Sequence, residues 1–297
     1  MVSLFNKHGS DNVFNKICSR DDLDMVRKMI DHMCSSVGYL LDSNYPYKLR
    51  CNFYSRYWEL YLGYKMMKLG LPLINRDDST GPDFCLERDG ARVWVEAIVP
   101  KIGDGVDAVP EFEHCGFVPN TKILLRITNA MDEKLRKWQG YIDGGVIRKT
   151  DAYVVAMNLC DLEYCMMDST PPRCVSAMYP FGEEYVAIDP ITRDVVDCGI
   201  QWEEQIIKVS GAPVRKDSFC SENYSGISGL LYAYETPLDT ISPMQAYHRY
   251  MNNCHANVSV PGWWSDCFNQ LVVEMHNSGK KYYSYRSVNK ELWKWDG

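Results

Sequence analysis

An antiparallel β-hairpin is the firmest element that the sequence predicts. Two strand-like runs, 83–88 and 92–99, flank an Asp-Gly dipeptide, which is a strong signal for a two-residue hairpin turn. This pairing places Asp83 at the start of the first strand and Glu96 near the end of the second. The two carboxylates are therefore expected at the same end of a β-sheet.

Helical and strand patterns surround this hairpin. Aromatic and apolar residues recur at three- and four-residue steps over 52–69, and Gly70 is a natural C-terminal stop. A second helix is expected over 129–142. The continuous apolar run at 152–158 is typical of a strand buried on both faces. This order predicts an α/β fold with a mixed central β-sheet flanked by helices.

The 297-residue chain is long enough for one large domain with appended parts. We expect an N-terminal helical segment at 1–40, a core at 41–160 and a β-rich C-terminal extension at 161–297 that packs on the core. A long loop, rich in glycine, proline and acids, is expected over 100–121. Within the extension, a hairpin is expected around Pro190.

Composition narrows the class of protein. A hydrophobic content of 46% and a charged content of 24% are ordinary for a globular protein. No apolar run approaches the roughly 20 residues of a membrane-spanning helix, and the first residues lack an apolar signal-peptide core. No phosphate-binding loop or dinucleotide-binding glycine pattern occurs. We therefore expect a cytoplasmic protein with no membrane contact and no dinucleotide cofactor.

Basic residues are clustered although the formal net charge is −7. Residues 44–70 carry five Lys and Arg against Glu59 alone, and residues 122–149 carry seven against three acids. The segment 280–297 has five basic residues with tyrosines and tryptophans between them. Such segments can follow a phosphate backbone and stack on bases. The alternative is that these long side chains cover amphipathic helices while their charges stay in water.

Three acids on these elements predict a metal site. Asp83 and Glu96, held side by side, repel each other unless a cation neutralises them. Glu59 lies among tryptophan, leucine and tyrosine, where burial of a charge without a cation is costly. Strand alternation places Glu96 on the face of Trp94, and the main-chain carbonyl of Ala97 could add a ligand. We expect Mg²⁺, with Mn²⁺ as a substitute.

The segments RYWELYLGYKMMKLG, GPDF and VWVEA resemble the PD-(D/E)XK restriction-endonuclease-like superfamily, and uncharacterised bacterial proteins of that type in particular. The resemblance covers roughly residues 50–158. It implies a four-stranded mixed sheet flanked by helices and divalent-metal-dependent cleavage of DNA. It also implies that Glu59, Asp83 and Glu96 are the metal-binding acids.

One position departs from the superfamily pattern, because Ile98 stands where the motif lysine is expected. The following helix could supply a lysine instead, since Lys134, Lys137 and Tyr141 share one helical face. We expect Lys134 in this role, with Lys137 second. If no lysine reaches the acids, the fold is expected to bind nucleic acid or a protein partner without cleaving.

The sequence thus predicts a Mg²⁺-dependent DNA endonuclease, with the inactive binding module as the alternative. The expected catalytic residues are Glu59, Asp83, Glu96 and Lys134. Arg126, Lys137 and Tyr141 are expected to contact the nucleic acid. The alternative for Arg126 is that it belongs to a polar segment leading into the N-cap of the following helix. Whether the chain forms a homodimer stays open.

Overall fold

The computed structural model describes residues 3–75, 80–112, 116–164, 166–238, 248–278 and 280–288. Its helices are α1 (Asn12–Ser19), α2 (Asp24–Val37), α3 (Tyr45–Cys51), α4 (Phe53–Lys68), α5 (Asn120–Asp143), α6 (Arg173–Met178) and α8 (Gly262–Ser265). Its strands are β1 (Phe84–Arg88), β2 (Ala91–Ile98), β3 (Ala152–Asn158), β4 (Phe181–Ile188), β5 (Val195–Trp202), β6 (Gln205–Ile207), β7 (Pro213–Arg215), β8 (Gly229–Ala233), β9 (Arg249–Asn252), β10 (Asn269–Ser278) and β11 (Lys280–Val288).

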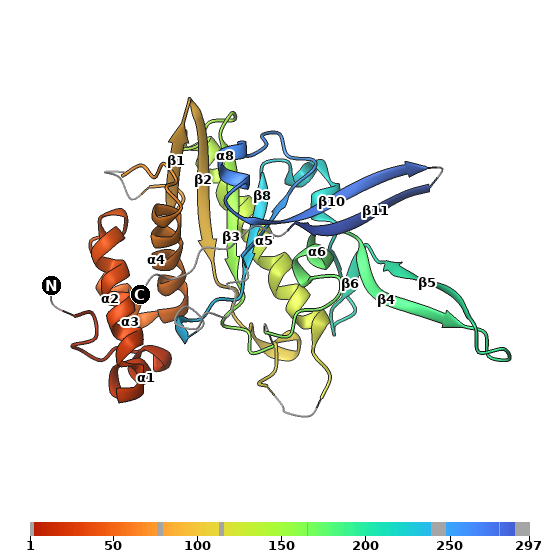
Figure 1. Ribbon diagram of the computed structural model, residues 1–297, viewed down its shortest axis with the longest axis horizontal. Coiled ribbons are helices and arrows are strands. Elements are labelled where there is room, and N and C mark those ends of the chain that lie inside the picture. Colours follow the sequence, from red (N-terminus) through yellow and green to blue (C-terminus); the bar gives the residue numbers. More distant parts are fainter. Residues whose placement is uncertain are drawn as a thin grey trace.

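A seven-stranded mixed sheet forms the centre of the molecule, in the order β1-β2-β3-β8-β9-β10-β11 (Figure 1). The β1–β2 hairpin is antiparallel, and β2, β3 and β8 run parallel to one another. Strand β9 is antiparallel to β8 and parallel to β10, which forms an antiparallel pair with β11. The expected α/β fold with a mixed central sheet is therefore confirmed.

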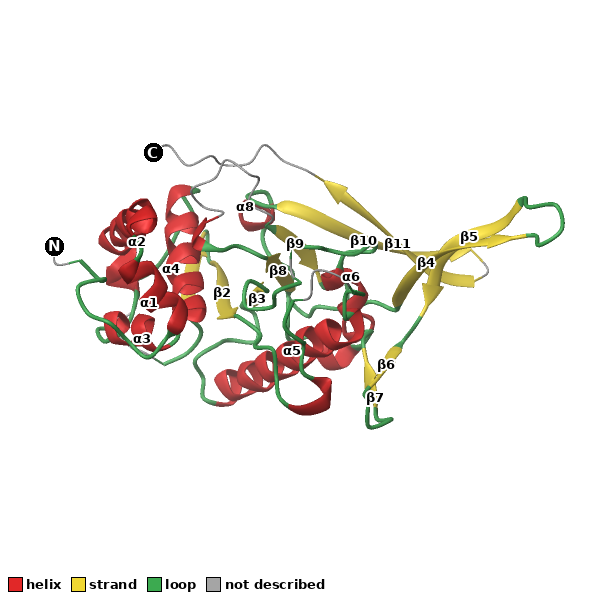
Figure 2. Cartoon of the chain, turned by 90° about the horizontal axis from the view of Figure 1, so that it is seen from below, coloured by secondary structure: helices red, strands yellow, loops and turns green. Residues whose placement is uncertain are grey.

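Helices cover both faces of this sheet. Figure 2 shows α1 to α4 gathered on one side of the strands and α5 on the other. Side chains alternate accordingly along β2, where Val93 and Val95 pack with the N-terminal helices and Trp94 packs with α5 and α6. Strand β3 is buried along its whole length, as expected for a strand covered on both faces.

The C-terminal third contributes more to the sheet than the sequence predicts. The resemblance implies four strands, and 161–297 is expected to pack on the core. Instead, β8 to β11 extend the central sheet, so the boundary at residue 160 does not separate the sheet from the rest of the chain. The physical reason is that β8, buried throughout, adds its apolar residues to β3 by parallel pairing.

Helix α5 is also longer than its periodicity predicts. It begins at Asn120 rather than at residue 129, which shortens the loop predicted over 100–121. Ile123, Leu125 and Ile127 are buried and anchor these additional turns in the core. Arg126 therefore lies within α5. The alternative, that Arg126 belongs to a polar segment leading into the N-cap, is wrong.

Two β-ribbons extend from the central body (Figure 1). One is the β4–β5 hairpin, which confirms the hairpin expected around Pro190. The other is β10–β11, which contains the first part of the basic, aromatic segment 280–297. Residues 289–297 of that segment lie outside the described residues. Among the described residues, no helix is both long and apolar enough to span a bilayer.

Candidate active site

The three predicted acids line one cavity, with a volume of about 470 Å³, between α4, the β1–β2 hairpin and α5. We call it the carboxylate cavity. Its lining includes Glu59, Asp83, Glu96, Lys134 and Lys137. These residues come from α4, the segment before β1, β2 and α5, and span 79 positions of sequence, from residue 59 to residue 137. The fold therefore brings together the residues that the sequence assigns to one site.

Asp83 lies directly before β1, and the pairing of Phe84 with Val95 sets it beside Glu96 on β2. Its Oδ2 accepts a hydrogen bond of 2.7 Å from the backbone N–H of Ala97. Desolvation by the surrounding protein atoms, and then the negative charge of Glu96, raise the pKa of Asp83 to about 6. Because Asp83 is exposed to solvent, water screens part of this effect. Loss of solvation and the negative charge of Glu96 both shift the pKa of Asp83 upward.

Glu96 is buried on the α5 side of the sheet, as strand alternation predicts. Its Oε1 lies 2.8 Å from Nζ of Lys134 and 3.1 Å from Nζ of Lys137. The hydroxyl of Tyr141 donates to the other oxygen, Oε2, over 3.3 Å. Two lysines from α5 thus contact the strand acid Glu96, two positions before Ile98. This placement agrees with the prediction made from helical spacing.

The charge of Glu96 changes the acidity of its neighbours. Burial raises the pKa of Tyr141 to about 12, and the negative charge of Glu96 adds to this effect. Burial lowers the pKa of Lys137, but its charge interaction and hydrogen bond with Glu96 outweigh burial, so the net shift is upward. Tyr141 is therefore a hydrogen-bond donor and Lys137 a cation at neutral pH.

Glu59 projects from α4 with its side chain only 12% exposed. The Nη1 atom of Arg56 lies 2.7 Å from each of its carboxylate oxygens. Burial, followed by repulsion from Asp83, nevertheless raises the pKa of Glu59 to about 8. The ion pair with Arg56 lowers the pKa of Glu59, whereas burial raises it. The net shift is upward because the ion pair offsets only part of the desolvation.

The donor chemistry of this cavity suits a hard divalent cation, but the carboxylates are not drawn together around one point. Among the described residues, no three His, Cys, Asp or Glu side chains are grouped closely enough to hold a metal ion. Glu96 is turned towards Lys134 and Lys137, and Glu59 towards Arg56. A bound Mg²⁺ would therefore have to compete with these ion pairs. Burial, and then the negative charge of a neighbouring carboxylate, raise the pKa of both Asp83 and Glu59, and a bound cation would favour their charged forms.

Other basic residues form the rim of the carboxylate cavity. Arg126 lines it from α5, and its guanidinium packs so closely on Gly103 that a Cβ atom there would lie 1.9 Å from Nη1. Gly103 also has a φ of +81°, which a side chain would strain. Lys101 lines the same cavity and pairs with Asp161 at 3.0 Å. Arg126 is thus held at the mouth, where the sequence places a phosphate contact.

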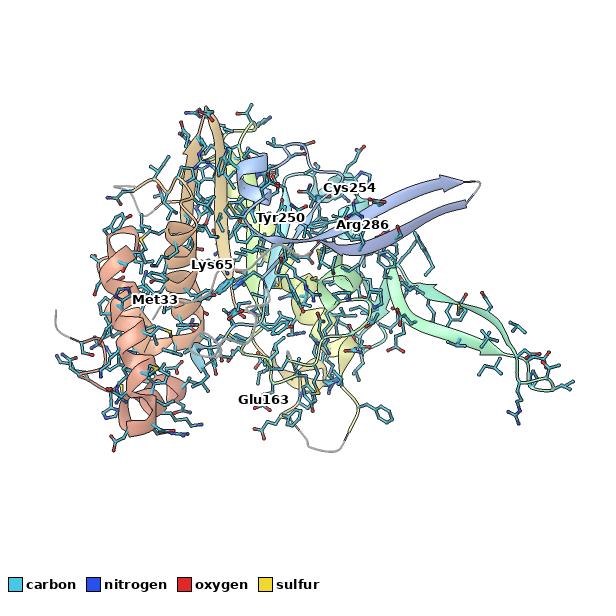
Figure 3. All side chains as sticks on the ribbon, viewed as in Figure 1. Met33, Lys65, Glu163, Tyr250, Cys254 and Arg286 are labelled. Carbon is cyan, nitrogen blue, oxygen red and sulfur yellow. The ribbon has the colours of Figure 1, made fainter. Side chains whose placement is uncertain are left out.

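Two side-chain contacts made by α4 residues were not predicted. One is the Arg56–Glu59 ion pair, for which the three-residue helical spacing was an available signal. The other is the contact of 2.9 Å between Nζ of Lys65 and Nδ1 of His248, both buried. Figure 3 labels Lys65, which lies between α4 and the sheet. No local pattern could reveal this second pair, because its partners lie 183 residues apart.

The Lys65–His248 pair supports α4 rather than the cavity. The His248 ring stacks between Trp58 and Tyr61, with centroids 6.0 Å and 5.4 Å away. Burial, and then the nearby positive charge of Lys65, keep the pKa of His248 well below its usual value, so the ring is neutral and accepts from Lys65. This pair fixes the helical turns that carry Glu59.

Comparisons of the chain with protein-family models, curated proteins and solved structures found no match. The resemblance to the PD-(D/E)XK superfamily therefore stays a prediction from the sequence segments that carry it.

Proposed function

We propose that this protein is a Mg²⁺-dependent phosphodiesterase that cleaves nucleic acid, with DNA as the first substrate to test. One observation carries the proposal: Glu59, Asp83, Glu96 and Lys134 line a single open cavity, with Lys134 2.8 Å from Glu96. Three acids and a lysine from separate elements are the residue types that metal-assisted phosphodiester hydrolysis requires.

Each side chain has a distinct role in this proposal. Asp83 and Glu96, with Glu59 and the carbonyl of Ala97, would hold Mg²⁺, or Mn²⁺ in its place. The bound ion would lower the pKa of water and stabilise negative charge on the phosphate. Lys134, almost fully buried at 4% exposure, would orient the attacking hydroxide or the phosphate oxygen. Water adds to phosphorus, the bond to the leaving sugar oxygen breaks, and that oxygen gains a proton.

Residues at the mouth would bind the phosphate backbone. Lys137 is 45% exposed, so it can leave Glu96 for a phosphate without losing its hydration. Arg126 offers a planar guanidinium suited to phosphate oxygens. Tyr141 would donate a hydrogen bond from its hydroxyl. These contacts would make affinity fall as the salt concentration rises.

A second candidate function has support from a specific observation. In the present arrangement Glu96 is neutralised by two lysines, and no three His, Cys, Asp or Glu side chains of the described residues are grouped closely enough to hold an ion. A scaffold that binds nucleic acid or a protein partner without cleavage would need no bound metal ion. The two functions differ in their dependence on metal.

Cleavage and binding assays separate the two functions. We expect the wild-type protein to cut plasmid or oligonucleotide DNA with Mg²⁺ or Mn²⁺, and EDTA to abolish cleavage. The Asp83→Ala variant should lose cleavage by at least about 100-fold, the scale of removing one preorganised charged group, while its DNA affinity in EDTA stays nearly unchanged. Asp143→Ala, an exposed acid at the end of α5, is the control and should cleave normally. Wild-type protein that binds DNA in EDTA but cuts no strand with either metal would reject the nuclease and favour the binding module.

A further inference from the structure

A second cavity adjoins the carboxylate cavity and shares three of its lining residues. It has a volume of about 640 Å³ and is lined by residues 39–45, Lys48, Ile74 and 81–85, together with α4 residues. We call it the Tyr39 cavity. Arg56, Glu59 and Asp83 line both cavities, so the two spaces meet at the candidate catalytic acids.

The charges around the two cavities differ. Among the described residues, five basic side chains (Arg56, Lys101, Arg126, Lys134 and Lys137) and four acids (Glu59, Asp83, Glu96 and Glu133) line the carboxylate cavity, a balance of 5 − 4 = +1. Lys48 and Arg56 line the Tyr39 cavity against Asp42, Glu59 and Asp83, a balance of 2 − 3 = −1 within the described part of the chain. The carboxylate cavity is therefore the better site for a phosphate, whereas the Tyr39 cavity disfavours an anion and suits a neutral group.

The walls of the Tyr39 cavity carry groups that contact nucleobases in other proteins. Tyr39 is 59% exposed, so its ring is accessible for stacking on a base. Ser43 and Asn44 are exposed and present hydroxyl and amide groups. Asn44 is the N-cap residue of α3, yet its side chain makes no capping hydrogen bond to the described backbone. Its amide can therefore pair with the edge of a base.

The size of the cavity restricts the form of the substrate. A volume of about 640 Å³ is in the range of pockets that hold small ligands, and so is suited to one nucleotide. Bases in a duplex are stacked inside the helix, and extruding one costs its stacking and pairing free energy, which is smallest where the base is already unpaired. An unpaired base next to the cleaved phosphate would enter this cavity at the lowest cost.

We propose that the Tyr39 cavity binds an unpaired nucleobase beside the phosphate in the carboxylate cavity, which makes single-stranded nucleic acid the preferred substrate. The proposal rests on the proposed function, since it takes the carboxylate cavity as the phosphate site. The base stacks on Tyr39 and its edge contacts Asn44, while the adjoining phosphate lies near Lys137 and Arg126. Specificity for strandedness thus comes from the α2–α3 connection rather than from the catalytic residues.

Binding measurements in EDTA test this proposal without any need for cleavage. Fluorescence anisotropy would compare a labelled single-stranded oligonucleotide with the fully paired duplex of the same sequence. We expect the wild type to prefer the single strand, and Tyr39→Ala to weaken that binding about 5- to 150-fold, which corresponds to the loss of stacking on one base. Tyr39→Phe, which keeps the ring, should retain the affinity.

Tyr47→Ala provides the matched control, because Tyr47 is another exposed tyrosine, at 64%, on the neighbouring helix α3 and does not line the cavity. It should bind as the wild type does. Equal affinity of the wild type for the two forms, or equal weakening by Tyr39→Ala and Tyr47→Ala, would overturn the proposal. The proposed function has a separate test: metal-dependent cutting of duplex with no effect of Tyr39→Ala rejects the base site alone. Tyr39-dependent binding without any cleavage rejects the nuclease alone.

Discussion

Glu59 is the residue at which stability and the proposed function oppose each other most directly. Its side chain is largely buried on α4, beside Asp83, and its pKa is raised to about 8. The folded protein therefore binds a proton that the unfolded chain, with a usual value near 4.5, has released. In the metal-free protein the free energy of unfolding should fall as pH rises through the window from about 4.5 to about 8.

The Glu59→Gln variant removes this ionisation, so it should be more stable than the wild type at pH 8.5 and similar at pH 4.5. We expect a rise in Tm of a few degrees at pH 8.5, since about 1 kcal/mol corresponds to about 2–4 °C in a chain of this size class. Thermal unfolding at both pH values in EDTA would measure the effect. Glu133→Gln, an exposed acid on α5, serves as the control. A Gln variant less stable than the wild type at both pH values would mean that the Arg56 ion pair outweighs desolvation.

At the scale of elements, the site depends on how closely α4 approaches β1. Gly63 lies one turn after Glu59 and packs on Phe84, the residue next to Asp83. A Cβ atom at Gly63 would lie 3.0 Å from Cε1 of Phe84 and 3.7 Å from Cγ2 of Val37. The absence of a side chain at Gly63 therefore permits the helix and strand to bring two of the candidate metal-binding acids to the same cavity.

We expect Gly63→Ala to lower both the free energy of unfolding and the rate of DNA cleavage. Overpacking costs about 1–3 kcal/mol, and the higher helix propensity of alanine offsets at most about 1 kcal/mol. Gly140→Ala on α5 is the matched control, since a Cβ atom there meets none of the described atoms within 4 Å. That control should be stabilised by up to about 1 kcal/mol. Denaturant unfolding that ranks the two variants equally would contradict the role of Gly63.

Over the whole molecule, local patterns predicted the parts of the core that are contiguous in sequence. The β1–β2 hairpin, α4 and β3 follow from turn chemistry and periodicity, and the placement of Lys134 follows from helical spacing. Pairing between distant segments has no such signal, so the extension of the sheet by β8 to β11 was not predicted. The contact between Lys65 and His248 was not predicted for the same reason.

The sequence predicted which residues line the candidate site but not how these residues are paired with one another. The sequence placed Asp83, Glu96 and Glu59 around one ion, and the fold brings all three to one cavity. The sequence predicted that Lys134 or Lys137 would reach the acids, but not that both would pair with the same oxygen of Glu96, because the lengths and orientations of side chains on α5 decide that contact. A metal ion bound here would therefore have to displace these ion pairs.

The most direct test of this account is a crystal structure of the protein soaked in Mn²⁺, with the anomalous signal used to locate the ion. We predict a peak in the carboxylate cavity within about 2.0–2.2 Å of oxygens of Asp83 and Glu96, the distance range for small hard cations, with Lys137 displaced from Glu96. Anomalous density absent from this cavity, with Lys134 and Lys137 still paired with Glu96, would contradict the proposed metal-dependent nuclease.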